Sequence, residues 1–452
     1  MDLKLKPVLE LQAALWSGKT TSRELTEQAL ARIKDPDGEG SRTFLQVHDE
    51  AALIAADTSD ALRASGVVPS PLAGIPVSLK DLFDEQGQQT KAGSKSLDDV
   101  APAAKDSIVT ARLRAAGAII VGRTNLTEFA YSGLGLNCHY DTPRNPWDRE
   151  TGRIPGGSSS GAGVSVADGM CAVAIGTDTD GSVRIPSAVN GVTGFKTTTG
   201  RIPLNGVYPL SSTLDSVGPL APTIGCCIIA DAILADRPHK IPTALPIDNL
   251  RFGIPQHYVL SDLDDHVAAT FEETIRRLER AGASVSEVAS PMYDEIPDAM
   301  PNGGILGAEA FAHHRGRMDE EKHRYDPRVW VRIRRGENLS AADLIDCHKR
   351  RGEIQKSAGE MALPFDALLM PTCPIVAPAV APLDNDEELY GTTNIMMLRN
   401  TTVGNFLNTC ALSLPCQAPG TGPVGLMIMT APQHDEWLVR IGLAVERALI
   451  GQ

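Results

Sequence analysis

The apolar stretch CAVAIGT, residues 171–177, limits the possible folds most, because Thr177 is its only polar residue. A continuous apolar run of this length fits a β-strand that is covered on both faces. The segment GVSVADG before it has helical character, and the turn DTDG after it leads into a plausible helix start at SVRIPSAVNG. This order predicts a buried sheet between layers of helices.

The flanking sequence repeats the alternation of helix and strand. Thr21 and Glu24 have the spacing of a capping box at the start of an amphipathic helix. Further on, a helix is predicted to end at Gly117, to be followed by a strand over 118–121 and by another capped start near Asn125. The predicted fold class is therefore α/β, with a central sheet of parallel or mixed strands covered on both faces by helices.

The second half has longer periodic segments, which predict helices over 264–283 and 341–362 and strands in FDALLMPT and PVGLMIM. With no internal repeat and no long linker, we expect one large domain over residues 1–452.

Charge and composition exclude several classes of protein. The formal net charge of −14, with scattered basic residues, argues against nucleic-acid binding. No apolar run is long enough to span a bilayer, and the start of the chain does not resemble a signal peptide. The eight cysteines show no zinc-binding spacing, and we expect free thiols in a reducing environment. These features predict a cytoplasmic protein without a membrane partner.

The glycine-flanked serine run GGSSSGAG, residues 156–163, allows several interpretations. It matches G-x-S-x-G with Ser159 as nucleophile, but that elbow needs a preceding strand, and TPRNPWDRETGRIP is unsuited to one. It lacks the G-K-[ST] ending of a phosphate-binding loop. Taken alone, the run would be a Gly/Ser connector.

Two residues outside the run change this interpretation. Ser182 lies between a buried strand and a helix start, where converging N–H groups can stabilise an oxyanion, although a lone serine there is more often a helix cap. Lys80 ends the apolar run GIPVSLK, and burial could hold it neutral as a general base. For an arbitrary lysine, a surface pair with Asp81 or Asp84 is the commoner role.

Together, GIPVSLKD, the segment from TPRNPWDRETGRIP to GGSSSGAG, and GTDTDGSVRIPSAVNGVTGFKTTTGRI resemble the amidase signature family of serine amidohydrolases. The resemblance implies an amidase-signature fold and a Ser-Ser-Lys triad of Lys80, Ser158 and Ser182. Ser158 lies 24 residues before Ser182, the usual family spacing, which selects it from the three serines as the proton relay. The core signature region covers about 70–225, and a more variable half that forms the pocket covers about 226–452.

The resemblance also implies the chemistry of an acyl-enzyme. Ser182 would attack an amide carbonyl while its proton passes through Ser158 to Lys80. Neither a metal nor an organic cofactor is required. The resemblance assigns oxyanion stabilisation or substrate contact to Thr179, Asp180, Gly181, Ser182, Tyr131 and Ser132.

Position 180 departs from the family, which usually has glycine where this chain has Asp180. A carboxylate near an oxyanion would repel it unless the side chain turns away or pairs with a cation such as Arg184. We expect Asp180 to have a hydrogen-bonded structural role or to shape substrate preference. Asp178 and Arg184 are expected to support the serine loop.

The leading functional hypothesis is an amidase that cleaves a small carboxamide or ureido-type amide, acting alone or as a homodimer. An alternative is an amidotransferase A-type subunit that releases ammonia from glutamine for a partner, although such subunits typically have Gln where this chain has Ile185. The third is a non-catalytic scaffold homologue within a complex.

Overall fold

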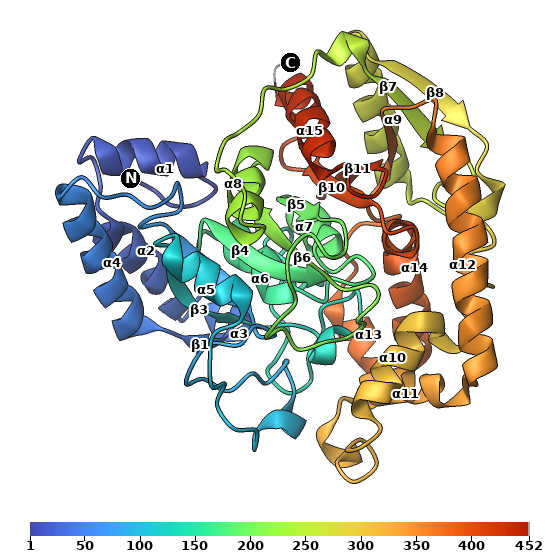
Figure 1. Ribbon diagram of the computed structural model, residues 1–452, viewed down its shortest axis with the longest axis horizontal. Coiled ribbons are helices and arrows are strands. Elements are labelled where there is room, and N and C mark those ends of the chain that lie inside the picture. The colour runs from blue at the N-terminus through green and yellow to red at the C-terminus, as the bar shows by residue number, and fades with distance from the viewer. Residues whose placement is uncertain (451–452) are drawn as a thin grey trace.

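The computed structural model describes residues 1–450, and its strands form one mixed sheet (Figure 1). Within that range, the eleven strands follow the order β1-β3-β2-β4-β6-β5-β10-β11-β9-β7-β8. They are β1 (Phe44–Val47), β2 (Pro76–Lys80), β3 (Ile119–Thr124), β4 (Val173–Asp178), β5 (Thr193–Lys196), β6 (Ser216–Ala221), β7 (Arg251–Pro255), β8 (Ser284–Val288), β9 (Ala367–Pro371), β10 (Cys410–Pro415) and β11 (Gly425–Thr430).

The pairing of the strands gives the sheet its mixed character. β2 runs parallel to both of its neighbours, β3 and β4, with Val77 opposite Ile120 and Val173. β7 is parallel to β8 and β9, and the remaining pairs are antiparallel. All residues of β4 are buried, which confirms the covered strand predicted from CAVAIGT.

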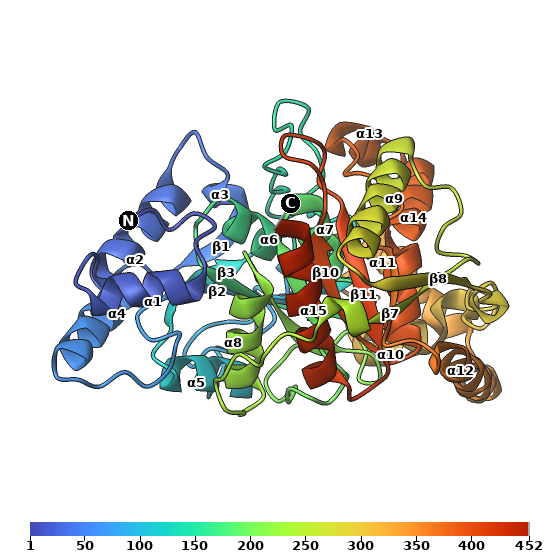
Figure 2. The ribbon, with the colours of Figure 1, turned by 90° about the horizontal axis from the view of Figure 1, so that it is seen from above.

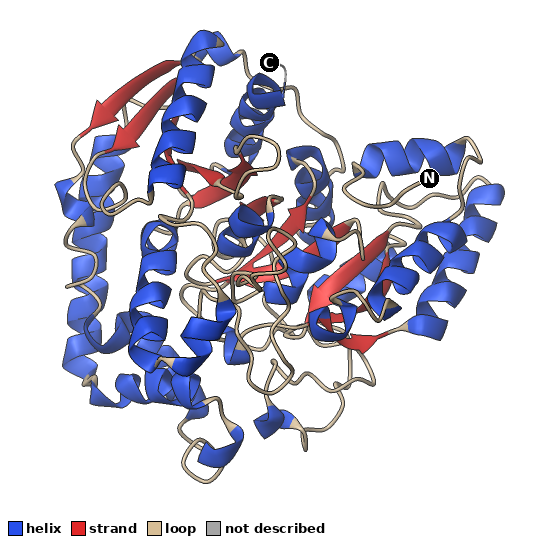
Figure 3. Cartoon of the chain, turned by 180° about the vertical axis from the view of Figure 1, so that it is seen from behind, coloured by secondary structure: helices blue, strands red, loops and turns tan. Residues whose placement is uncertain are grey.

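Fifteen α-helices lie within residues 1–450 (Figure 3). They are α1 (Val8–Trp16), α2 (Ser22–Lys34), α3 (Gly40–Thr43), α4 (Asp49–Ala64), α5 (Ile108–Ala115), α6 (Ser160–Ala167), α7 (Arg184–Asn190), α8 (Ile224–Leu234), α9 (Asp265–Arg280), α10 (Gly304–His314), α11 (Pro327–Arg335), α12 (Ala341–Ala362), α13 (Val380–Asn385), α14 (Glu387–Phe406) and α15 (Asp435–Ile450).

Helices cover both faces of the sheet (Figure 2). Two successive residues of β10 pack against helices on opposite faces. Leu412 faces α15, where a Cβ on Gly442 would lie 2.4 Å from its Cδ1. Ser413 points the other way, since a Cβ on Gly425 would lie 2.6 Å from both its Oγ and Cβ of Ala188 in α7. The predicted α/β class with helices on both faces is therefore confirmed.

Local signals placed most of the predicted elements correctly. Thr21 and Glu24 form the predicted capping box of α2, and α9 and α12 occupy the two periodic segments of the second half. The capped helix start expected near Asn125 is wrong, because only a short 3₁₀ turn forms at Glu128–Ala130. The Asn125 amide instead donates to the carbonyls of Arg42 and Asp141.

The helices α10, α11 and α12 lie at the end of the molecule opposite the N-terminal helices α1, α2 and α4 (Figures 1 and 3). No helix among residues 1–450 is both long and apolar enough to cross a membrane. The cysteines are free thiols, of which Cys138 is exposed and the other seven are buried.

Candidate active site

Lys80 is the last residue of β2, and its side chain is completely buried. Its Nζ donates to Ser158 Oγ at 2.7 Å and to Thr177 Oγ1 at 2.9 Å. Thr177 lies near the end of β4, which is parallel to β2, so both side chains come from the same edge of the sheet. The sheet therefore brings the lysine to the serine run.

The charge state of Lys80 follows from its surroundings. Burial lowers the pKa of Lys80 to about 7, although the nearby acids Asp215 and Asp178 raise it. In a substantial fraction of molecules at neutral pH, Lys80 is therefore a neutral amine, which is the form that can accept a proton.

The serine loop before α6 is tightly packed. The peptide bond between Gly157 and Ser158 is cis. A Cβ on Gly157 would lie 2.5 Å from the Gly135 nitrogen, so glycine is required for the close approach of these two segments. The Ser159 hydroxyl donates to the Thr177 carbonyl at 3.3 Å, whereas Ser160 Oγ is buried without a hydrogen-bond partner in the described chain.

Ser182 follows β4 in a loop held by Asp178. One Asp178 oxygen accepts from the Gly181 N–H at 2.9 Å, and the other accepts from the Val183 N–H at 3.1 Å. The Ser159 N–H reaches the Ser182 carbonyl at 3.4 Å, which places the two serine loops side by side. These contacts fix the backbone around Ser182 against the segment that carries Ser158.

Arg184 completes this network with a fully buried ion pair to Asp178, at 3.0 Å. Asn405 of α14 donates to the same carboxylate at 2.9 Å and also contacts the Arg184 guanidinium. Burial alone would raise the pKa of Asp178, but Arg184 holds it well below its usual range. Arg184 therefore forms its ion pair with Asp178 and not with Asp180.

A cavity of about 260 Å³ opens beside Ser182. It lies between the loop after β4 and the helices of the second half, and its size suits a small substrate. The wall includes the apolar side chains of Leu210, Leu214, Met300, Leu306, Ile395, Leu398 and Phe406. Its polar and charged lining includes Tyr131, Ser132, Thr179, Asp180, Tyr258, Arg332, Arg335, Asn394, Arg399, Thr402 and Asn405.

The two expected substrate contacts differ in their availability. Tyr131 lines the cavity, and burial raises its pKa to about 12, so it remains a phenol. The Ser132 hydroxyl also borders the cavity, but it donates to Asn394 and accepts from Tyr390, each at 2.8 Å. The Ser132 hydroxyl is therefore already hydrogen-bonded to two side chains of this protein.

Asp180 is a partly buried residue in the same wall. Burial raises its pKa to about 7, with a smaller contribution from the charge of Asp178, while Thr402 and the two arginines Arg184 and Arg332 act in the opposite direction. The Thr401 hydroxyl donates to the Asp180 carbonyl at 2.8 Å, which anchors its backbone to α14. Asp180 is therefore neutral in a substantial fraction of molecules at neutral pH.

Sequence reasoning missed several residues of the site. Thr177 is predicted only as part of a strand, although its position at a parallel strand end beside Lys80 was a usable signal. Asp215, Arg332 and Asn405 come from distant segments and have no local motif. Only the folded chain brings them beside the serine loops.

Comparison with known proteins gives consistent results. The family model described as Amidase matches residues 24–439. The chain is 37% identical to the 2-amino-5-chloromuconic acid deaminase of Comamonas testosteroni, covering 98% of this chain and 96% of the relative. It is 31% identical to the glutamyl-tRNA(Gln) amidotransferase A-type subunit of Roseiflexus sp. (strain RS-1), covering 97% and 95%. A crystal structure of an amidase superposes with a TM-score of 0.88 and 30% identity, covering 99% of this chain and 100% of that one.

Proposed function

Because the chain belongs to the amidase family, we propose that it is a serine amidohydrolase that cleaves a small carboxamide or ureido-type amide. The observation that carries this proposal is the 2.7 Å hydrogen bond between the buried Lys80 Nζ and Ser158 Oγ. With a pKa of about 7, Lys80 can act as a base near neutral pH, and the serine that it contacts can act as the proton relay.

In the proposed reaction, Ser182 Oγ forms a bond to the amide carbonyl carbon. Its proton passes to Ser158, whose own proton passes to neutral Lys80, since a hydroxyl can donate and accept at once. The protonated pair returns a proton to the leaving nitrogen as the C–N bond breaks. Water then attacks the acyl-enzyme by the same relay, releasing the acid and restoring Ser182.

Backbone N–H groups of the loop after β4 would stabilise the tetrahedral oxyanion, each by about 3–4 kcal/mol. Of the four expected donors, Gly181 already gives its N–H to Asp178. We therefore assign this role to the remaining N–H groups, those of Thr179, Asp180 and Ser182. Asp178 acts as a positioning residue that shapes the loop.

Two kinds of relative supply the competing candidates. Similarity to the amidotransferase A-type subunits of several bacteria supports the hypothesis that this chain releases ammonia from glutamine for a partner protein. Similarity to the Comamonas testosteroni deaminase supports ammonia release from a compound such as 2-amino-5-chloromuconic acid. Both reactions release ammonia, so the organic substrate distinguishes them from each other and from a simple amidase.

The test combines labelling with a substrate panel. A fluorophosphonate probe should label Ser182 in the wild-type protein but not in Ser182→Ala, with the labelled peptide identified by mass spectrometry. Ammonia release is then measured with aliphatic, aromatic, ureido and dicarboxylic amides, glutamine and 2-amino-5-chloromuconate. No labelling and no ammonia from any compound in a folded preparation would favour the scaffold hypothesis, and glutaminase activity that needs a partner would favour the amidotransferase hypothesis.

A further inference from the structure

Helix α11 carries arginines with two different environments. Arg334 pairs with Asp319 at 2.5 Å and with Glu337 at 2.7 Å. Arg328 pairs with Asp326 and Asp384 at 2.8 and 3.0 Å. In residues 1–450, Arg332 and Arg335 have no carboxylate within 4.0 Å, and both line the cavity beside Ser182.

The Arg332 side chain is fixed in place while part of its hydrogen-bonding capacity stays free. One terminal nitrogen donates to the Tyr131 carbonyl at 2.7 Å, and the guanidinium carbon lies 5.8 Å from the Tyr131 ring centre. A guanidinium has five N–H donors, so several remain for a ligand. Arg335 is three residues further along the helix, which places it on the same side of α11.

The charges around the cavity contrast with those of the whole protein. The chain has a formal net charge of −14, yet three arginines line this cavity. Arg399 is the third, and its nearest carboxylate, Asp262, is 4.0 Å away and largely exposed. Among residues 1–450, the only acid in the cavity lining is Asp180, whose raised pKa leaves it partly neutral. The cavity is thus positively charged next to the nucleophile.

We propose that Arg332 and Arg335 bind a carboxylate of the substrate, which makes the substrate class an amide that carries a second, acidic group. The apolar side chains that line the same cavity, such as Leu306 and Leu398, suit a short hydrocarbon spacer. Monoamides of small dicarboxylic acids fit this description. This inference rests on the proposed amidohydrolase function, because it concerns the substrate of the same site.

Matched substrate pairs test the inference. Succinamic, glutaramic and adipamic acids are compared with their methyl esters, which keep the amide and the spacer but remove the charge. We expect at least one acid to have a kcat/KM roughly tenfold or more above that of its ester. Arg332→Gln should reduce this ratio through KM, and Arg335→Gln should do so more weakly because Arg335 is more exposed. Arg334→Gln is the control and should keep the ratio.

A binding measurement separates this inference from the proposed function. Calorimetric titration of succinate, glutarate and adipate into Ser182→Ala requires no turnover, and Arg332→Gln in that background should weaken the binding. Equal kcat/KM for acid and ester, or dicarboxylate binding indifferent to Arg332, would overturn the inference even if Ser182 is labelled and neutral amides are cleaved. Dicarboxylate binding that depends on Arg332, without labelling of Ser182 or hydrolysis, would support the anion site and reject the hydrolase.

Discussion

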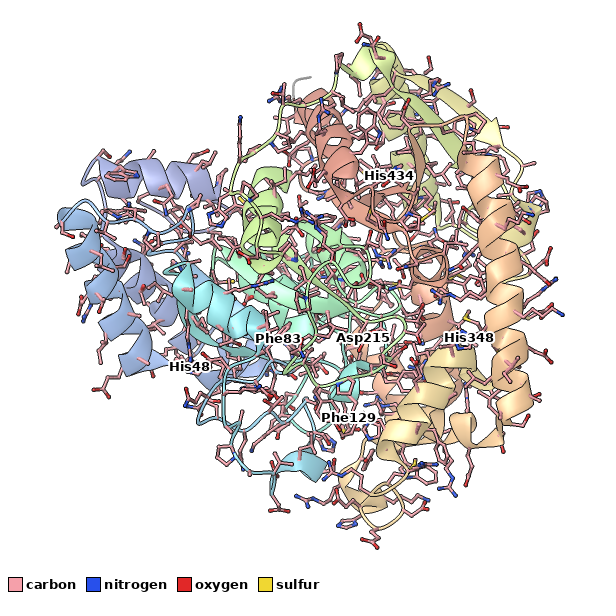
Figure 4. The ribbon with its side chains drawn as sticks, in the orientation of Figure 1. His48, Phe83, Phe129, Asp215, His348 and His434 are labelled. Carbon is pink, nitrogen blue, oxygen red and sulfur yellow. The ribbon has the colours of Figure 1, made fainter. Side chains whose placement is uncertain are left out.

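Thr179 Oγ1 donates a hydrogen bond of 2.6 Å to Asp215 Oδ1, which joins the loop after β4 to the loop before β6. Asp215 lies in the central part of the molecule (Figure 4), and its other oxygen accepts from the Leu210 N–H at 3.0 Å. Its carboxylate raises the pKa of Lys80, against the larger effect of burial. The basicity of Lys80 thus depends on a residue outside the serine loops.

The first prediction concerns the pH dependence of the reaction. Only deprotonated Lys80 can accept a proton, so kcat/KM for a neutral amide should rise as the pH increases through about 7. The profile is measured between about pH 5.5 and 9, with circular dichroism to confirm that the fold persists. Since Asp180 also titrates near 7, the experiment is repeated in Asp180→Asn. A flat profile in both proteins would contradict Lys80 as the base.

The second prediction concerns Asp215→Asn. The substitution removes a negative charge that favours protonated Lys80, so the pKa of the lysine should fall further. The acid limb of kcat/KM should therefore move to lower pH by about one unit. Asp37→Asn, at an exposed position, is the control for the change in net charge. A purely structural role for Asp215 would lower activity without moving the limb.

The third prediction compares two neighbouring serines. Ser158→Ala removes the hydroxyl that is hydrogen-bonded to Lys80 and should reduce kcat by roughly 10³-fold or more. The loss is large because removing one member of a catalytic unit abolishes most of the contribution of the whole unit. Ser160→Ala removes a buried hydroxyl that has no partner in the described chain, so kcat should stay within about threefold of the wild type. Thermal melting checks both folds. Similar losses in the two variants would point to loop packing and not to a relay.

The sequence predicted best where neighbouring residues decide the structure. The capping box of Thr21 and Glu24 is closed within one helical turn, and the apolar run of β4 indicates its burial directly. The failure near Asn125 has a tertiary cause. Its amide bonds to two carbonyls from other segments, while its Oδ1 accepts the next N–H, so the residue organises a junction and caps no helix.

The residues of the candidate site also differ in whether the local sequence could identify them. Lys80 was identifiable because it ends an apolar run that could bury its amine and because the run belongs to the family motif, and Ser158 was selected through the family spacing. Arg332 could not be identified, because α11 reads as a basic amphipathic helix in which the arginines look alike. Only packing distinguishes the arginines that pair with acids from those that line the cavity.

The fourth prediction concerns stability and the buried pair of Asp178 and Arg184. Arg184→Met leaves a buried carboxylate without its cation, so the free energy of unfolding should fall by about 3–5 kcal/mol in urea titrations at neutral pH. The low pKa of Asp178 contributes stability above the pKa of an unfolded aspartate, and this contribution is lost as the pH falls toward the lower folded value. Arg334→Gln breaks exposed pairs and should cost at most about 1 kcal/mol.

The fifth prediction assigns Asp180 a part in substrate preference. Burial raises its pKa to about 7, so its negative charge in the cavity grows as the pH rises above that value. Because a charged Asp180 repels an anionic substrate, KM for an acidic amide should increase above about pH 7, and Asp180→Asn should remove this increase, a gain of roughly threefold to tenfold. The matching methyl ester should show no such dependence. Asp180→Gly, which restores the residue usual in the family, should act like Asp180→Asn. If neither substitution alters the ratio of acid to ester at any pH, Asp180 only supports the loop through its carbonyl bond to Thr401.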